Sequence, residues 1–251
     1  MTERLAPLVF GIIGLAGWEG IVRALDVPPY ILPGPVAVLA AFTADPGSLL
    51  LALLSTLSVT FTALAVAAVL GVTMAVAMAM SRWAQAAIQP WAVVLQVTPL
   101  PAIAPLVIIW VGDPFVSLVV CATIVGFFPL FANTATGLMS PPAELNDLFH
   151  LYGASRWTEI RLLRLPAALP YFLSGLRISG GLALVGAVVA ELVAGSGGFA
   201  SGLAYRILEA SFRLEMPRMF AALLLLALAG IAINYGLAAL GRVIQRRWGE
   251  G

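Results

Sequence analysis

The sequence predicts an all-α protein that crosses a membrane several times, and three observations support this fold class. Hydrophobic residues make up 61% of the 251 residues, charged residues make up only 10%, and the mean hydropathy is +1.03. A soluble domain carries about 25% charged residues. Uncharged runs of 36, 30 and 30 residues follow Asp45, Arg82 and Asp113, whereas a helix spans a hydrocarbon core with about 20. We therefore expect one transmembrane helix-bundle domain over residues 1–251, with its core at about 49–241.

Six spans are expected from the apolar runs. They cover residues 5–24, 49–80, 87–111, 115–137, 168–194 and 219–241. The second is longer than a core of ~30 Å requires, so we expect it to be tilted or to project into the cytoplasm. The first could instead be a signal peptide, because Arg4 precedes its apolar run. Glu19 and Arg23 close that run without a small-residue cleavage site, which favours an uncleaved helix.

The arginines predict the orientation. All 13 basic residues are arginine. If the N-terminus faces the cytoplasm, nine of them lie inside and four lie outside, as the positive-inside rule requires. The inner nine are Arg4, Arg82, Arg156, Arg161, Arg164, Arg177, Arg242, Arg246 and Arg247. We expect both termini in the cytoplasm.

Three connections separate the spans. Residues 26–48 contain five prolines and predict an outer, periplasmic segment with a short interfacial helix near Val36–Phe42. Residues 195–218 predict an outer loop with an amphipathic helix near Leu203–Phe212. Residues 138–167 form the longest cytoplasmic connection. The two halves of the chain share no sequence repeat, which argues against an inverted-repeat secondary transporter.

Several function classes are excluded by composition. Without lysine, the chain has neither a standard Walker ATPase site nor Schiff-base chemistry. One histidine, His150, and one cysteine, Cys121, cannot form a Cys/His metal site or an internal disulfide. A net charge of +1 gives no reason to invoke nucleic acid. We expect a non-enzyme without metal or cofactor, whose function depends on its membrane path or on other chains.

The cytoplasmic connection carries the strongest pattern. Ser140 can cap a helix, and Gly153 supplies its stop. One apolar stripe at i, i+3, i+4 and i+7 comprises Leu145, Leu148, Phe149 and Tyr152. Ser155 can cap a second short helix, which Leu165-Pro166 ends before the fifth span. Such a helix–Gly–helix unit suits docking onto a soluble partner; the alternative is a hairpin that lies on lipid headgroups.

The order of these residues resembles the signature loop of permease subunits of binding-protein-dependent ABC importers. That loop reads EAA, three residues, Gly, nine residues, Ile-x-Leu-Pro. Asp147-Leu148-Phe149, Gly153 and Leu163-Arg164-Leu165-Pro166 stand here with the same spacing. Asp147 replaces the glutamate, Leu148 and Phe149 replace the alanines, and Leu163 replaces the isoleucine. GASRW (153–157) and LPAALPYFLSGLRIS (165–179) are also similar to the family's sequences.

The resemblance extends along nearly all of the chain. PPYILPGPVAV (28–38), TPLPAIAPLVIIWVG (98–112) and GAVVAELVAG (186–195) are similar to the nitrate, sulfonate and taurine branch, which also holds permeases for thiamine-precursor pyrimidines and riboflavin. It implies a type I importer permease fold in the bacterial inner membrane. Two permease copies, here expected to be a homodimer, form the path, and an external binding protein delivers cargo. Two partner ATPases hold ATP and Mg²⁺.

That family role assigns ATPase coupling to the loop. The expected coupling residues are Glu144, Leu145, Asp147, Leu148, Phe149, Tyr152, Gly153, Ala154, Ser155, Arg156, Leu163, Leu165 and Pro166. The resemblance favours a small anion such as a sulfonate, taurine or nitrate as cargo. A thiamine-precursor pyrimidine or a riboflavin-like compound is the alternative within the same machinery. An independent secondary transporter or channel and a membrane-embedded enzyme are alternatives of other classes.

Polar groups within the spans are candidates for the translocation path. Gln96, Thr98, Pro99 and Pro101 lie in the third span, where prolines free backbone carbonyls that must face protein or water. The alternative is a permanently kinked packing helix. Glu191 ends the fifth span and could line the outer mouth of the path, hold the outer loop, or be exposed at the outer surface. A small pair elsewhere, Gly175 and Ser179, predicts close helix packing.

Overall fold

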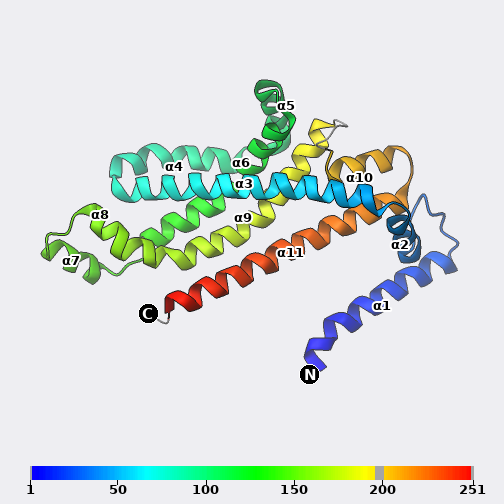
Figure 1. Cartoon of the computed structure of the whole chain (residues 1–251), viewed down its shortest axis with the longest axis horizontal. Coiled ribbons are helices and arrows are strands. Elements are labelled where there is room, and N and C mark those ends of the chain that lie inside the picture. The colour runs from blue at the N-terminus through cyan, green and yellow to red at the C-terminus, as the bar shows by residue number, and fades with distance from the viewer. Residues whose placement is uncertain (1, 196–200, 250–251) are drawn as a thin grey trace. The chain divides into compact units, whose positions relative to one another are not determined.

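A computed structural model describes residues 2–195 and 201–249, except for the side chains of residues 2–5, 7, 8 and 247–249. All regular structure in these residues is helical (Figure 1). The chain forms two compact units. The first comprises Met1–Ser55 and Ser196–Leu228, and the second comprises Thr56–Gly195 and Ala229–Gly251.

The first unit is built around a short apolar helix. It contains α1 (Thr2–Ala24), α2 (Pro35–Ala44), α10 (Leu203–Phe212) and the first parts of α3 (Pro46–Met80) and α11 (Met216–Gly249). Its core comprises Val38, Leu49, Ala52, Leu203, Ala221 and Ala222. Because Gly34 is extended and proline follows it at the first helical position, α2 starts there. The positions of α2 and α10 confirm the helices expected near 36–42 and at 203–212.

The second unit contains the remaining helices. They are α4 (Arg82–Val97), α5 (Leu100–Val111), α6 (Pro114–Leu138), α7 (Ala143–Leu151), α8 (Arg156–Glu159), the π-helical turn η1 (Ile160–Arg164) and α9 (Leu165–Ala194), with the later parts of α3 and α11. α9 packs along α6, and α5 contacts both. Fully buried residues such as Cys121 and Leu130 place the core of this unit on α6.

Glycines allow the close approach of α6 and α9. A Cβ at Gly175 would lie 3.1 Å from the carbonyl oxygen of Pro129, and one at Gly186 would lie 2.9 Å from the Cα of Ala122. Ser179, one helical turn after Gly175, is fully buried. Small residues at such a contact let backbones meet, which confirms the packing role expected of the Gly175–Ser179 pair.

The length and composition of the helices support several membrane spans. Among the described residues, α3, α6, the run from α8 to α9, and α11 are long and apolar enough to cross a membrane. The α4–α5 pair adds a fifth candidate if it counts as one span. α1 is not among them, and part of its side chains lies outside the described residues. The fold is therefore all-helical with four or five span candidates.

The expected third span, 87–111, is not one kinked helix. α4 and α5 meet at 105°, so the expectation of a single helix bent by its prolines was wrong. Thr98 has an extended backbone, because a residue that precedes proline is pushed out of the helical region. Pro99 and Pro101 then start α5, where their missing N–H groups cost no helix hydrogen bond.

Two expected helix boundaries in 138–167 also differ. Ser140 does not cap α7; its hydroxyl donates to the Gly137 carbonyl at the end of α6 (2.8 Å), and Pro142 holds the N-cap position. Leu165-Pro166 does not end the helical run, which continues from α8 through η1 into α9. The wide π turn closes with the Leu165 N–H bonded to the Ile160 carbonyl. We attribute the continuity to this turn, which lets the chain enter α9 with Pro166 in its first turn.

Candidate functional site

The turn after α7 is fixed by its backbone. Gly153 has φ +64°, a left-handed conformation that glycine adopts without steric cost. Its N–H donates to the His150 carbonyl (3.0 Å), and the Ala154 N–H donates to the Phe149 carbonyl (2.9 Å). This pair of bonds is the Schellman arrangement, which closes a helix end without side-chain help. The expected stop at Gly153 is therefore confirmed.

A second cap begins α8. The Ser155 hydroxyl accepts a hydrogen bond from the Thr158 N–H (3.2 Å), as expected for an N-cap serine. Between them, the two caps define the path of residues 152–155. The joint between α7 and α8 thus depends on local backbone geometry rather than on burial.

α7 leaves its apolar stripe uncovered. The helix has no buried residue. Leu148 is 44% exposed and Tyr152 is 83% exposed, Leu145 is similarly open, and Phe149 is half-buried. Apolar side chains grouped on an exposed face typically mark a surface that another molecule covers.

Two arginines tie this exposed unit to the rest of the second unit. Arg156 donates from Nη1 to the Met80 carbonyl oxygen at the end of α3 (2.8 Å). Arg164 donates from Nε to Oε1 of Glu159 (2.7 Å), and from Nη2 to Oδ1 of Asn146 on α7 (3.5 Å). Because Glu159 is buried, the ion pair holds a charge that would be costly to leave alone.

The sequence reasoning missed the Glu159–Arg164 pair. The two residues are five positions apart, a spacing that does not share a face in an α-helix. The π turn between them brings i and i+5 together. A lone acid before an arginine-rich stretch was the only available signal, and it did not indicate burial.

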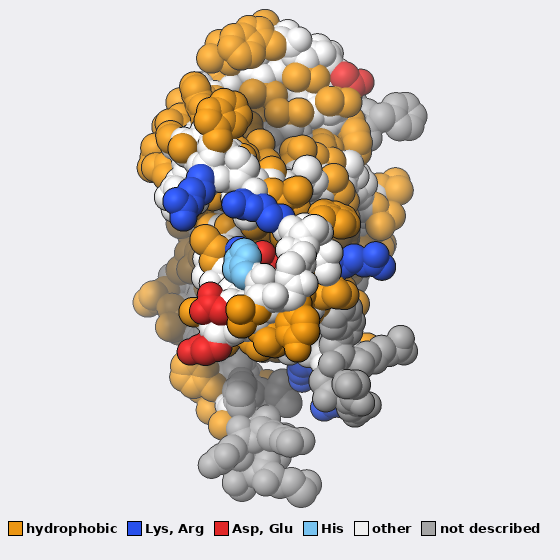
Figure 2. All heavy atoms as spheres, turned by 90° about the vertical axis from the view of Figure 1, so that its left-hand side faces the viewer, with side chains coloured by type: hydrophobic (Ala, Val, Ile, Leu, Met, Phe, Trp, Pro, Cys, Tyr) orange, Lys and Arg blue, Asp and Glu red, His pale blue; other side chains and the backbone are white. Residues whose placement is uncertain are grey.

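Charged groups gather at the end of the second unit that carries α7 and α8. Figure 2 shows blue, red and pale blue side chains close together there, among hydrophobic ones. A polar cavity of about 300 Å³ is lined by Arg82, Arg156 and Arg164 together with His150 and Glu159. Three guanidinium groups face one carboxylate, so the cavity is basic.

A second cavity lies where α4, α6 and α9 meet. It has a volume of about 350 Å³, and Gln96 and Thr98 line it. The other lining residues include Phe128, Pro129 and Val185, and no charged residue is among those that the structure describes there. Pro99 and Pro101 do not line this cavity; they start α5 instead. Thr98 directs its hydroxyl to the Val94 carbonyl (2.6 Å).

Glu191 lies apart from that cavity. Its side chain is 3% exposed, and Oε1 accepts a hydrogen bond from the Thr56 hydroxyl on α3 (2.9 Å). This burial does not agree with the alternative of simple exposure at the outer surface. Residues 196–200, which follow Gly195 at the end of α9, lie outside the described residues.

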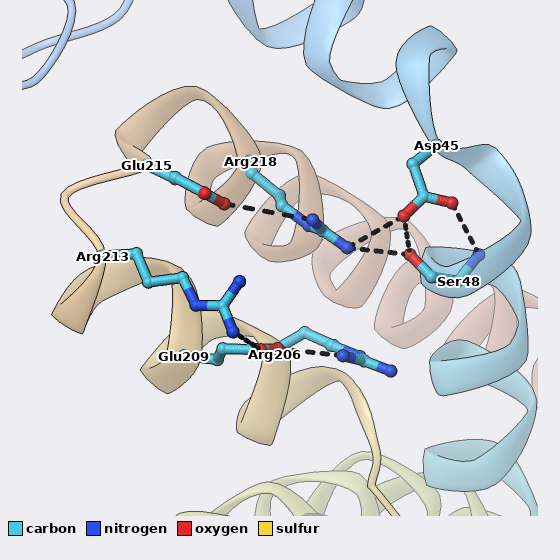
Figure 3. Close-up of polar contacts among 7 residues, drawn as sticks. All are labelled: Asp45, Ser48, Arg206, Glu209, Arg213, Glu215 and Arg218. Atoms are coloured by element: carbon cyan, nitrogen blue, oxygen red, sulfur yellow. Dashed lines mark hydrogen bonds and ion pairs between the residues drawn. The ribbon is translucent and has the colours of Figure 1, made fainter.

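Arginines in the first unit are matched by acids (Figure 3). Arg206 and Arg213 both contact Glu209 at 2.9 Å, and Arg218 contacts Asp45 at 3.0 Å. The Ser48 hydroxyl donates to the Asp45 carboxylate (2.6 Å) and accepts from Arg218 (3.0 Å). The pKa of Asp45 is lowered by these Ser48 hydrogen bonds and then by the positive charges of Arg218 and Arg206. The cluster is therefore neutralised internally.

The structure thus separates the predicted residues into three places. The coupling residues form the exposed α7–α8 unit, although Leu163, Leu165 and Pro166 are half-buried beyond it. Of the path candidates, Gln96 and Thr98 line one cavity, whereas Glu191 bonds to α3 elsewhere.

Comparison with known proteins identifies the family. Residues 67–250 match the family described as "Binding-protein-dependent transport system inner membrane component". The chain belongs to this family. This permease is accordingly a membrane component of an ABC importer.

Two relatives align with more than nine-tenths of this permease, and a third aligns with about two thirds of it. The "Formylaminopyrimidine transport permease protein ThiX" of Halalkalibacterium halodurans is 31% identical over 96% of this permease and 94% of its own length. The "Riboflavin transport system permease protein RibX" of Chloroflexus aurantiacus is 34% identical over 93% and 86%. The "Putative aliphatic sulfonates transport permease protein SsuC" of Bacillus subtilis is 32% identical over 64% and 57%.

Proposed function

We propose that α7 and the Gly153 turn form the surface through which a separate ATPase drives this permease. The observation that carries the proposal is the exposed stripe of Leu145, Leu148 and Tyr152 on a helix that buries nothing. A partner groove that covers the stripe would remove its apolar surface from water, which favours binding by about 25 cal/mol per Å² buried. Arg82 and Arg161 are exposed, so they are available to pair with the partner's carboxylates.

The anchors explain how docking would move the spans. Arg156 connects the unit to the end of α3, and η1 continues it into α9. Displacement of α7 would therefore act on two spans at once. A ligand shifts an equilibrium only by its differential affinity for the two states, so ATP must favour one arrangement of the permease through this joint.

The assembly follows the family pattern. We propose a homodimer of permeases with six spans each and with both termini in the cytoplasm. Two ATPases carry ATP and Mg²⁺, and a periplasmic binding protein delivers cargo. Arg156, Arg161 and Arg164 in the connection support the inner placement of residues 138–167, since arginines favour the cytoplasmic side.

We place the translocation path at the cavity that Gln96 and Thr98 line. Glu191 has a positioning role in this proposal, because its bond to Thr56 joins α9 to α3. The bent junction of α4 and α5 brings the polar side chains of Gln96 and Thr98 to the cavity, where irregular backbone is tolerated next to water.

For cargo we propose a neutral nitrogen heterocycle, of the kind named for the formylaminopyrimidine and riboflavin permeases. The cavity of about 350 Å³ suits a small ligand and has no cation among its described lining residues. Relatives named for such cargo align over more than nine-tenths of this permease. A small anion such as a sulfonate is the second candidate, supported by the shorter sulfonate alignment.

Reconstitution tests the function. Proteoliposomes that hold the permease, its ATPase and its binding protein should take up a labelled aminopyrimidine only with ATP. Taurine and nitrate are the competing cargoes in the same assay. Uptake at full rate by the permease alone would overturn the ATPase-driven mechanism, and uptake of taurine but not the pyrimidine would overturn the cargo assignment alone.

A further inference from the structure

A basic groove between α9 and α11 in the second unit is not explained by transport. Its volume is about 390 Å³. Arg177 and Arg242 line it with the polar side chains of Ser174, Tyr235 and Gln245, and leucines close its other side. No carboxylate is among the described residues that line it.

Arg177 lies on α9, where its side chain lines the groove. It lies 12 residues after the start of α9, or roughly 18 Å along the helix axis. Its side chain is exposed, yet Nη2 and Nε both donate to Oδ1 of Asn234 on α11, at 2.9 and 3.3 Å. A neutral amide orients the guanidinium but leaves its charge uncompensated.

Among the described residues, no acid lines the groove to neutralise that charge. No acidic residue lies between Arg164 and Glu191, or between Glu215 and Glu250. Glu191 is 14 residues after Arg177, which corresponds to about 21 Å along α9. Two guanidinium groups beside apolar helix surface are costly without a counter-ion or water, so the groove favours an anion from outside the chain.

The surroundings of the groove indicate an amphiphile rather than a free ion. Ile178, Ile231, Leu240 and Val243 are exposed on the same two helices. Tyr235 is 68% exposed and combines an apolar ring with a hydroxyl, as aromatic residues at membrane interfaces do. A basic groove that opens onto apolar span surface matches a ligand with an anionic head and hydrocarbon tails.

We propose that this groove binds the phosphate headgroup of an anionic phospholipid. Arg177 and Arg242 donate charge-assisted hydrogen bonds to the phosphate oxygens, and Tyr235 and Gln245 border the headgroup. The acyl chains lie along the exposed apolar residues of α9 and α11. The site is independent of the cargo and of the ATPase contact.

Mass spectrometry of the intact, detergent-purified protein tests the site with added phosphatidylglycerol or phosphatidylcholine. The wild type should retain phosphatidylglycerol in preference to phosphatidylcholine. Arg177→Gln and Arg242→Gln should each weaken phosphatidylglycerol retention about fivefold. Arg213→Gln, which alters an arginine paired with Glu209 in the first unit, is the matched control and should not change retention.

Three results would overturn the proposal. They are equal retention of the two lipids, unchanged retention in both groove variants, and displacement of the lipid by millimolar inorganic phosphate, which would indicate a free-anion site. If Arg177→Gln does not fold, Arg242→Gln decides, because its side chain is exposed near the end of α11.

Discussion

Two short helices, α7 and α10, differ in how far their apolar side chains are buried. α10 buries Leu203, Ala204 and Ala210 within its own unit, and its arginines pair with Glu209. α7 buries none of its residues and exposes Leu145 and Leu148. Both were expected from the sequence as amphipathic helices, so amphipathicity alone did not distinguish them.

The difference lies in what completes each helix. α10 packs into its unit through Leu203, Ala204 and Ala210 and its charges have partners, although Phe212 at its end is 81% exposed. α7 is held by the glycine turn at its C-terminal end and by Asn146, which bonds to Arg164. A helix that is ordered by its ends but uncovered on its apolar face is suited to a partner that arrives from outside. This contrast is the basis for assigning coupling to α7.

The largest effect on transport is expected from a charge introduced on the α7 stripe. Leu148→Asp should abolish ATP-driven uptake, because a carboxylate in an apolar groove loses its hydration without a partner. The protein should still reach the membrane, since Leu148 supports no core. Leu214→Asp is the matched control, because Leu214 is a 64% exposed leucine outside the loop. Equal uptake by Leu148→Asp and wild type contradicts the coupling role.

The next largest effect is expected at the turn. Gly153→Val places a β-branched residue at φ +64°, which costs roughly 1–2 kcal/mol although no atom lies within 4 Å of the added Cβ. Cargo-stimulated ATP hydrolysis should fall, and Gly153→Asn should restore most of it, because asparagine tolerates this conformation.

Gly112 provides a control for backbone strain in general. It has φ +73° and equally free space, but it joins α5 to α6. Gly112→Val should therefore carry a similar strain without the same loss of coupling. If both valine variants lose coupled hydrolysis equally, strain rather than the α7 turn is the cause.

Substitutions in α10 should lower the stability of the protein more than substitutions in α7, the reverse of their expected effects on transport. Leu203→Ala in α10 removes a fully buried side chain and should cost about 2–5 kcal/mol. Leu148→Ala in α7 should change stability by less than about 0.5 kcal/mol. Thermal unfolding of the purified protein compares the two. A larger loss for Leu148→Ala would mean that α7 is covered within the chain.

The smallest effect concerns the neutralised cluster near α10. Because the pKa of Asp45 is lowered by Ser48 and by Arg218, its ionised form stabilises the fold above the ordinary pKa of 3.8, and this contribution is lost as pH falls through the lowered value. Asp45→Asn should slightly lower the unfolding temperature at neutral pH, and the difference should vanish in strong acid. A difference that grows in acid would contradict the assignment.

Much of this architecture could be predicted because local rules decide it. Gly153 ends a helix through its own backbone freedom, and Gly175 marks close packing through the absence of a side chain. Local rules did not predict the break between α4 and α5 at Thr98 or the π turn at 160–164. Prolines permit either a kink or a new helix, and the Glu159–Arg164 bond exists only after the π turn has formed.

Accessibility of a cysteine on the α7 stripe tests the central claim most directly. The only native cysteine, Cys121, is buried, so Leu148→Cys introduces one exposed thiol and Leu214→Cys provides the control. The account predicts that the ATPase protects the thiol at position 148 from maleimide and leaves the thiol at 214 reactive. Equal labelling of both thiols in the assembled transporter would contradict it.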